Sequence, residues 1–110
     1  MRNINKLSSG YELIEFEELD STMTMMKEMA LAGCNIKTVV RAKRQISGRG
    51  RHGRVWESPL GNLYFSFLRQ SEKNNRNIFA PVFIAALSVA HAIIYVTKNK
   101  LSPSIKWPND

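Results

Sequence analysis

The segment of this sequence best equipped for chemistry is residues 48–54, Gly-Arg-Gly-Arg-His-Gly-Arg. Glycine lets a backbone approach a ligand closely, and arginine offers a planar fork of donors that fits phosphate or carboxylate oxygens. A loop of this kind can wrap an anion, with peptide N–H and guanidinium groups pointing inward. The same composition is also typical of a solvated turn or of a nucleic-acid contact. On local composition these three interpretations stay open.

Charge is unevenly distributed along the chain, which carries a formal net charge of +7 over 110 residues. Residues 41–54 hold six Lys or Arg and no acid, whereas residues 12–20 hold five acids and no base. This asymmetry favours an anion-binding region over a uniformly basic surface. The single cysteine, Cys34, excludes an internal disulfide and fits a reducing, cytoplasmic compartment. Two separated histidines form no zinc pattern, so no protein-built metal site is predicted.

The longest apolar run, residues 78–96, is almost long enough to span a bilayer, with only Ser88 and His91 clearly polar. Pro81 lies near its start, and several of its members are weakly hydrophobic alanines. A helix that is apolar on all sides is either lipid-facing or buried within a domain. We expect a helix buried in the centre of the domain, with a membrane-anchored or scaffold protein as the alternative.

The elements that must position the Arg-Gly loop follow from periodicity and composition. The side-chain oxygens of residues 20–22, Asp-Ser-Thr, are expected to cap the first helix. Residues 1–10 are expected to be a loose lead-in without regular structure. Gly33 and Asn35 can end that helix. This order predicts a sheet with helices packed on one face, of the α+β or α/β kind. The expected strands are 11–19, 38–42, 62–68 and 104–107, and the expected helices are 23–31 and 78 to about 98–100.

The run GRGRHGRVWESPLGNLYFS resembles the signature of biotin protein ligases, GRGR-x-GR-x-W-x-SP-x-G-x-LY-x-S. Two further pieces agree in order and spacing: Asp20-Ser21-Thr22 near the first helix, and Lys106-Trp107-Pro108-Asn109-Asp110. Lipoate ligases are related but lack the GRGR loop with its Trp-x-Ser-Pro continuation, so the biotin branch is favoured over a lipoate-ligase relative. The resemblance implies an α+β fold, a mixed sheet of the class II aminoacyl-tRNA synthetase-like, biotin-lipoate ligase type.

The resemblance also implies a two-step ligase that uses biotin, ATP and Mg²⁺ and modifies a lysine of a biotin carboxyl carrier protein. Arg49 and Arg51 are the expected catalytic residues, because positive charge must offset the repulsion between two anions. Peptide N–H groups of the loop would assist them. The expected biotin-binding residues are Ser21, Thr22, Gln45, Gly48, Arg49, Gly50 and Arg51. The expected nucleotide-binding residues are Arg54, Trp56, Lys106, Asn109 and Asp110.

Several of these residues have plainer interpretations. Ser21 and Thr22 could simply cap a helix without contacting a ligand. Trp56 and Trp107 could be core residues. Gln45 could be a surface amide and Lys106 a solvated strand lysine. His52 is interpreted as exposed and His91 as a core histidine. Two positions depart from the family pattern: Met23 stands where an asparagine is usual, and Ile46 where a glutamine or small residue is.

The family continues past its Trp-Pro-Asn-Asp turn, so residues 1–110 are expected to form the first half of a ligase catalytic domain. Such a chain is expected to be inactive or weakly active alone and prone to aggregate, with a homodimer or a complementing C-terminal half as possible partners. No winged-helix segment is seen, so no specific DNA binding is expected. Because residues 78–96 are interpreted as a buried helix, no membrane binding is expected either. The main alternative is a nucleic-acid-binding module in which Trp56, Tyr64 and Phe65 stack on bases.

Overall fold

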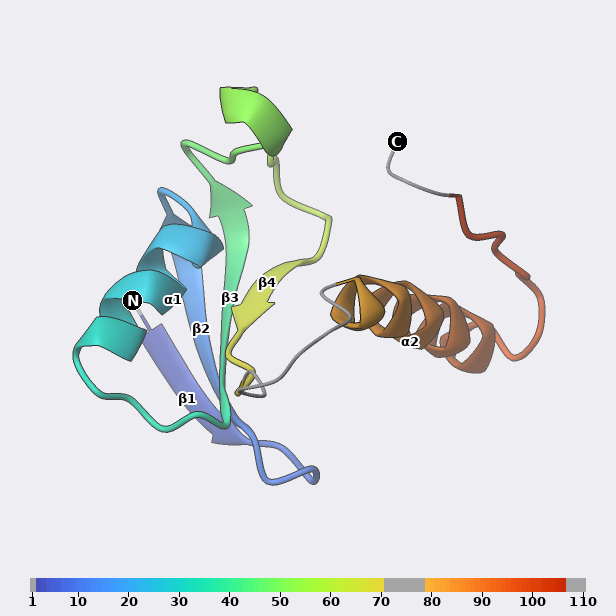
Figure 1. The fold of residues 1–110 in the computed structure, drawn as a ribbon, viewed down its shortest axis with the longest axis horizontal. Coiled ribbons are helices and arrows are strands. Elements are labelled where there is room, and N and C mark those ends of the chain that lie inside the picture. Colours follow the sequence, from blue (N-terminus) through green and yellow to red (C-terminus); the bar gives the residue numbers. More distant parts are fainter. Residues whose placement is uncertain (1, 71–78, 107–110) are drawn as a thin grey trace. The chain divides into compact units, whose positions relative to one another are not determined.

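The computed structural model describes residues 2–70 and 79–106. The chain divides into two compact units, Met1–Gln70 and Ser71–Asp110. The first unit contains a sheet and helix α1 (Thr22–Leu31), and the second contains helix α2 (Ala80–Val96). Figure 1 shows the elements of each unit.

The sheet of the first unit has four strands in the order β1-β2-β3-β4 (Figure 1). These are β1 (Arg2–Lys6), β2 (Glu12–Leu19), β3 (Thr38–Gln45) and β4 (Tyr64–Phe67). Strands β2 and β3 are parallel, and both outer pairs are antiparallel. Helix α1 makes the crossover that two parallel neighbours require. The predicted α+β class with a mixed sheet is therefore confirmed.

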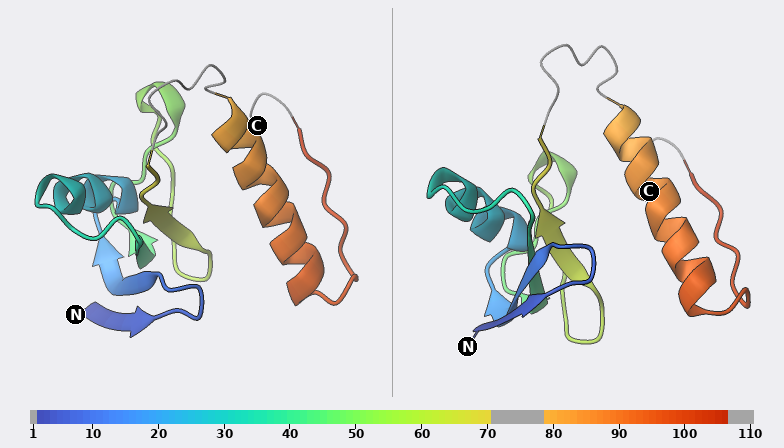
Figure 2. Two further views of the ribbon diagram at one scale, coloured as in Figure 1. Left: turned by 60° about the horizontal axis from the view of Figure 1, so that its bottom comes forward. Right: turned by 90° about the horizontal axis from the view of Figure 1, so that it is seen from below.

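Helix α1 lies against one face of this sheet, over β3 and β4 (Figure 2). Ser21 is its N-cap, and the Ser21 hydroxyl accepts a hydrogen bond from Thr24 N over 3.4 Å. Gly33, just past the helix, has a φ of +83°, a conformation that glycine adopts without steric cost. The apolar core of this unit is small and consists of Ile14, Met26, Val40 and Ala42.

Three expectations for the first unit were wrong in extent. The strand predicted at residues 62–68 is shorter, because β4 spans only Tyr64–Phe67. Residues 1–10 were expected to be a loose lead-in, but Arg2–Lys6 forms β1, antiparallel to β2. An edge strand with every residue exposed needs no apolar alternation, so its sequence shows no strand pattern. Strand β3 also runs three residues past the predicted end, to Gln45. Its charged extension pairs with β2, where Lys43 and Arg44 lie beside Glu17 and Glu18.

Helix α2 lies where the apolar run predicts a helix, and Pro81 stands in its first turn, where proline is tolerated. No helix within residues 2–70 and 79–106 is long and apolar enough to cross a membrane. Ala90 is the only buried residue among residues 79–106, so the described part of the second unit does not by itself bury this helix. His91, predicted to be a core residue, is exposed. The described part of this unit contains no second helix or strand that could cover α2.

The strand predicted at residues 104–107 is not formed by residues 104–106, which have no regular secondary structure. Trp107, Asn109 and Asp110 lie outside the described residues. The two predicted nucleotide-binding residues at 109 and 110 therefore remain predictions.

Candidate functional site

The Arg-Gly loop follows β3 directly and folds back on itself as a short irregular hairpin. Trp56 N donates to Gly48 O over 2.8 Å, and Gly50 N donates to Arg54 O over 2.7 Å. The tip is a single 3-10 turn, Arg51–Gly53. The N–H of Gly50, predicted to help bind an anion, is therefore used within the loop. The N–H of Gly48 has no hydrogen-bond partner within residues 2–70 and 79–106, and Gly48 itself is buried.

The Gln45 side chain links the base of this loop to the start of α1. Its Oε1 accepts a hydrogen bond from Thr22 N over 2.8 Å, and its Nε2 donates to Ser58 Oγ over 3.0 Å. Ser58 Oγ in turn donates to Trp56 O over 3.1 Å. Thr22 N is one of the N–H groups that a helix start leaves without an intrahelical partner. Gln45 is therefore not the surface amide of the plainer interpretation.

The side chains of Ser21 and Thr22 both have partners in the protein. Ser21 caps α1, and the hydroxyls of Thr22 and Ser66 on β4 lie 2.8 Å apart. Ser21 and Thr22 are each about 5% exposed. The capping interpretation of Ser21 is thus confirmed, and any ligand at this position would add to existing contacts rather than replace empty ones.

Gly48 is required by the space around it. A Cβ at this position would lie 2.4 Å from Trp56 O, 2.5 Å from Ser58 Oγ and 3.0 Å from Gln45 Nε2. Real Cβ atoms are not found that close to a backbone oxygen. The loop can therefore turn against the Gln45–Ser58 pair only with glycine at its first position.

The three arginines of the loop differ in their surroundings. The Arg49 Nη2 donates to Thr24 Oγ1 in the first turn of α1 over 2.8 Å. Arg51 and Arg54 are exposed and have no ion-pair partner in the described part of the chain. His52 is exposed, as predicted, with a φ of +59°. The structure therefore fastens Arg49 to the first turn of α1, whereas Arg51 stays at the loop tip.

The other half of the basic cluster is neutralised within the sheet. Arg41 pairs with Glu15, Arg44 with Glu18, and Lys43 Nζ lies 2.8 Å from Glu17 Oε1. A hydrogen bond from Lys43 lowers the pKa of Glu17, and the same bond raises the pKa of Lys43. Because β2 and β3 are neighbours, the acidic and basic segments of the sequence cancel. Of the six cations in residues 41–54, the three loop arginines are the ones that have no ion-pair partner in the described part of the chain.

Two pockets border this network. One, of about 530 Å³, contains Gln45, Ser58 and Trp56, with Arg44 and Glu18 at its wall. Trp56 is 61% exposed, so the interpretation of this tryptophan as a core residue is wrong. Its ring lies beside Gly50, where an added Cβ would meet Trp56 Cε3 at 3.8 Å.

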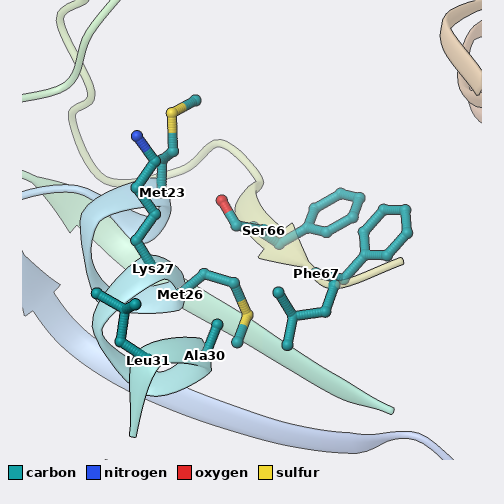
Figure 3. A pocket seen from close by; sticks show the side chains of 9 residues that line it. Met23, Met26, Lys27, Ala30, Leu31, Ser66 and Phe67 are labelled. Carbon is teal, nitrogen blue, oxygen red and sulfur yellow. The ribbon is translucent and has the colours of Figure 1, made fainter. Parts of the chain in front are cut away.

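The second pocket, of about 650 Å³, lies between α1 and β4 and is almost entirely apolar. Figure 3 shows Met26 and Ala30 on α1 and Ser66 and Phe67 on β4 around it. Ser66 joins this pocket to the polar network, because its hydroxyl is the partner of Thr22. Met23, at the position where the family usually has asparagine, also lines this pocket.

The structure brings five of the predicted site residues together and leaves others apart. Ser21, Thr22, Gln45, Gly48 and Arg49 are connected through hydrogen bonds or close contacts. No described pocket contains both Arg49 and Gln45. Lys106 belongs to the second unit. Thr24, Ser58 and Ser66 join this network although their residue types alone predict no role for them; the two serines stand in the signature run of residues 48–66.

The first unit thus combines a mixed sheet with an arginine-rich loop that is fastened beside a capped helix start. The chain belongs to the Biotin/lipoate A/B protein ligase family, whose model matches residues 15–110. No cluster of three or more His, Cys, Asp or Glu that could hold a metal occurs within residues 2–70 and 79–106.

Among curated relatives, the bifunctional ligase/repressor BirA of Bacillus subtilis is 32% identical over 102 residues, or 92% of this chain and 31% of that protein. The biotin–[acetyl-CoA-carboxylase] ligase of Paracoccus denitrificans is 32% identical over 83% of this chain and 38% of that protein. This chain therefore spans about a third of the length of these relatives. The biotin protein ligase of Aquifex aeolicus, solved with biotin and ATP, matches with a TM-score of 0.73 and 39% identity, over 89% of this chain and 40% of that one.

Proposed function

We propose that this chain supplies part of the ligand-binding surface of a biotin protein ligase. The Aquifex aeolicus relative was solved with biotin and ATP, and the Leishmania major relative, 30% identical with a TM-score of 0.67, with biotinyl-5-AMP. The two substrates are thus biotin and ATP, with Mg²⁺ entering on the nucleotide's phosphates.

The proposed reaction has two steps. The carboxylate oxygen of biotin attacks the α-phosphorus of ATP, a new C(O)O–P bond forms, and pyrophosphate leaves with the electron pair of the broken P–O bond. The amine of an acceptor lysine then attacks the acyl carbon of biotinyl-5′-adenylate. AMP leaves, an amide forms, and the amine loses a proton. The acceptor is a biotin carboxyl carrier domain, the class of protein on which biotin–carboxylase ligases act.

Arg49 is the residue best placed to assist the first step. A guanidinium stabilises the charge that spreads over a phosphoryl group, and it also screens the repulsion between carboxylate and phosphate. Its hydrogen bond to Thr24 holds it beside the start of α1. Arg51 and Arg54 carry charge on the exposed turn and would contact the ligand on closure of the loop.

The observation that carries this proposal is the fastening of the Arg-Gly loop to the start of α1. Gln45 reaches Thr22 across 23 positions of sequence, and Arg49 reaches Thr24 across 25. Biotin is an apolar bicycle with a polar ureido edge, so its site needs a few fixed polar groups beside apolar walls. Ser21, Thr22 and Gln45 are fixed polar groups of this kind, and the apolar pocket between α1 and β4 lies next to them.

Isothermal titration calorimetry of the 110-residue chain tests the proposal, with biotin and with a non-hydrolysable analogue of biotinyl-5′-adenylate as ligands. We expect tighter binding of the analogue, because it engages both the polar network and the loop arginines. Arg2→Ala is the charge-matched control for Arg49→Ala, which we expect to bind the analogue more weakly. Arg2 lies on exposed β1 and is not part of the loop. Absence of heat with both ligands, from a sample with a cooperative unfolding transition, overturns the proposal.

Single-stranded RNA is the comparison ligand for the alternative of a nucleic-acid-binding module. A ligase surface binds it weakly and with a steep dependence on salt. RNA binding that persists at physiological salt and exceeds binding of the adenylate analogue would favour the module instead. Whether the active species contains a second copy or a complementing C-terminal half is tested by the molar mass of the complex in light scattering.

A further inference from the structure

Ser58 is a buried polar residue just after the Arg-Gly loop, and its hydroxyl and its backbone carbonyl both have hydrogen-bond partners inside the protein. It is 5% exposed. Its backbone O accepts from Gln45 N over 3.0 Å, so the two residues form an isolated antiparallel bridge. Its hydroxyl accepts from Gln45 Nε2 and donates to Trp56 O. A buried hydroxyl with this many partners is expensive to remove.

The direction of each of these hydrogen bonds is fixed by one group. Thr22 N is a donor only, so the atom of Gln45 that faces it must be the acceptor, Oε1. The NH₂ group of Gln45 therefore faces Ser58, whose oxygen must accept. The hydroxyl proton of Ser58 is then free for Trp56 O. This relay runs from the start of α1, through Gln45 and Ser58, to the returning arm of the loop.

The relay also forms the surface against which the loop turns. A Cβ at Gly48 would meet Ser58 Oγ, Gln45 Nε2 and Trp56 O, so the backbone of Gly48 packs directly on the three relay groups. Trp56, which accepts from Ser58, donates its own N–H to Gly48 O over 2.8 Å. Loosening Ser58 would therefore disturb both arms of the loop that carries Arg49.

We propose that Ser58 is a positioning residue for the ligand-binding loop: its hydroxyl sets the orientation of the Gln45 amide and holds the Gly48 and Trp56 arms together. It touches no substrate in this role. Its effect on ligand affinity rests on the proposed function, whereas its effect on Gln45 and Thr22 does not.

The first test is the ¹⁵N–¹H spectrum of the full chain with Ser58→Ala. We expect the Thr22 amide and the Gln45 side-chain amide to shift, and the Thr22 N–H to exchange faster with solvent. Ser58 has no direct contact with Thr22, so only the relay through Gln45 predicts this effect. Ser47→Ala is the matched control, because the Ser47 side chain is exposed and its hydroxyl has no hydrogen-bond partner within residues 2–70 and 79–106. An unchanged Thr22 amide in Ser58→Ala overturns the relay, whether or not the chain binds biotin.

The second test is calorimetry of the same two variants with the adenylate analogue. Loss of one such hydrogen bond predicts about tenfold weaker binding by Ser58→Ala and no change for Ser47→Ala. A Thr22 shift with unchanged affinity would overturn the positioning role and leave the relay as a structural feature only. Should Ser58→Ala unfold, Ser58→Cys keeps a weaker donor and acceptor of similar size, and it must give the same shifts at smaller amplitude. If the wild-type chain binds no ligand, the proposed function fails, and the spectra alone decide on the relay.

Discussion

The Arg49 guanidinium donates a hydrogen bond to Thr24 Oγ1 over 2.8 Å, which joins the Arg-Gly loop to the first turn of α1. Together with the Gln45–Thr22 bond, this contact fixes the loop at two neighbouring residues of one helix start. Helix α1 in turn rests on β3 and β4. The charge of Arg49 is thus presented from a rigid base, although the loop around it has little regular structure.

Arg49→Ala is expected to weaken binding of the adenylate analogue by about 10- to 100-fold, because it removes a charged donor to an anion. Thr24→Val keeps the charge but removes its anchor, and we expect a loss of less than about fivefold. Both are measured by calorimetry at two salt concentrations. Equal losses in the two variants would show that the anchor, and not the charge, determines affinity.

Gly48→Ala is expected to lower the free energy of unfolding by about 1–3 kcal/mol, because its Cβ would collide with Trp56 O and Ser58 Oγ. Gly50→Ala is the matched control, since the nearest atom to the Cβ position there is Arg54 Cβ at 3.5 Å, an ordinary contact, and the φ of Gly50 is −92°. We expect that control to stay within about 0.5 kcal/mol of the wild type in urea denaturation. A destabilised Gly50→Ala with an unaffected Gly48→Ala would contradict this account of the loop.

Ser21→Ala is expected to cost about 0.5–1 kcal/mol of stability, since it removes the N-cap of α1. The value lies at the low end of the range because the bond to Thr24 N is 3.4 Å long. Ser21→Gly is expected to cost only about a few tenths of a kcal/mol of stability, because glycine is itself a tolerated N-cap. Thermal unfolding of the three proteins at one pH is sufficient, and equal midpoints for all of them would argue against capping.

The Glu17–Lys43 pair predicts a defined pH dependence. The hydrogen bond from Lys43 lowers the pKa of Glu17. The contribution of Glu17 to stability is therefore complete above the ordinary glutamate pKa and is lost as the pH falls through the lowered pKa. The pKa of Lys43 is raised, so its effect is complete below the ordinary lysine pKa and is lost as the pH rises through the raised value. Both groups are exposed, so the effect is small.

This dependence is measured as the difference in urea midpoint between the wild type and Lys43→Met. The difference should be largest between about pH 5 and pH 10 and should shrink towards both extremes. High salt should reduce it, because exposed charges are screened. A difference that grows on acidification would contradict the assignment.

Much of the fold follows from local sequence. The alternation of residues 11–19 and the cap at Ser21 correctly predict β2 and α1, and the apolar run correctly predicts α2. The Arg-Gly motif with its continuation identifies the family before any coordinates are considered. These features are determined by neighbouring residues, through steric preference, capping and periodicity, and a sequence records them directly.

What the tertiary structure decided is which groups meet. The pairing of β2 with β3 cancels Arg41, Lys43 and Arg44 against glutamates and leaves the loop arginines as the unbalanced charge. Gln45, Ser58 and Thr22 become one hydrogen-bonded relay only when the loop folds back onto β3. The exposed edge strand β1 exists because β2 offers it backbone partners, not because its own side chains favour a strand. Such contacts join distant positions, so local preference alone does not contain them.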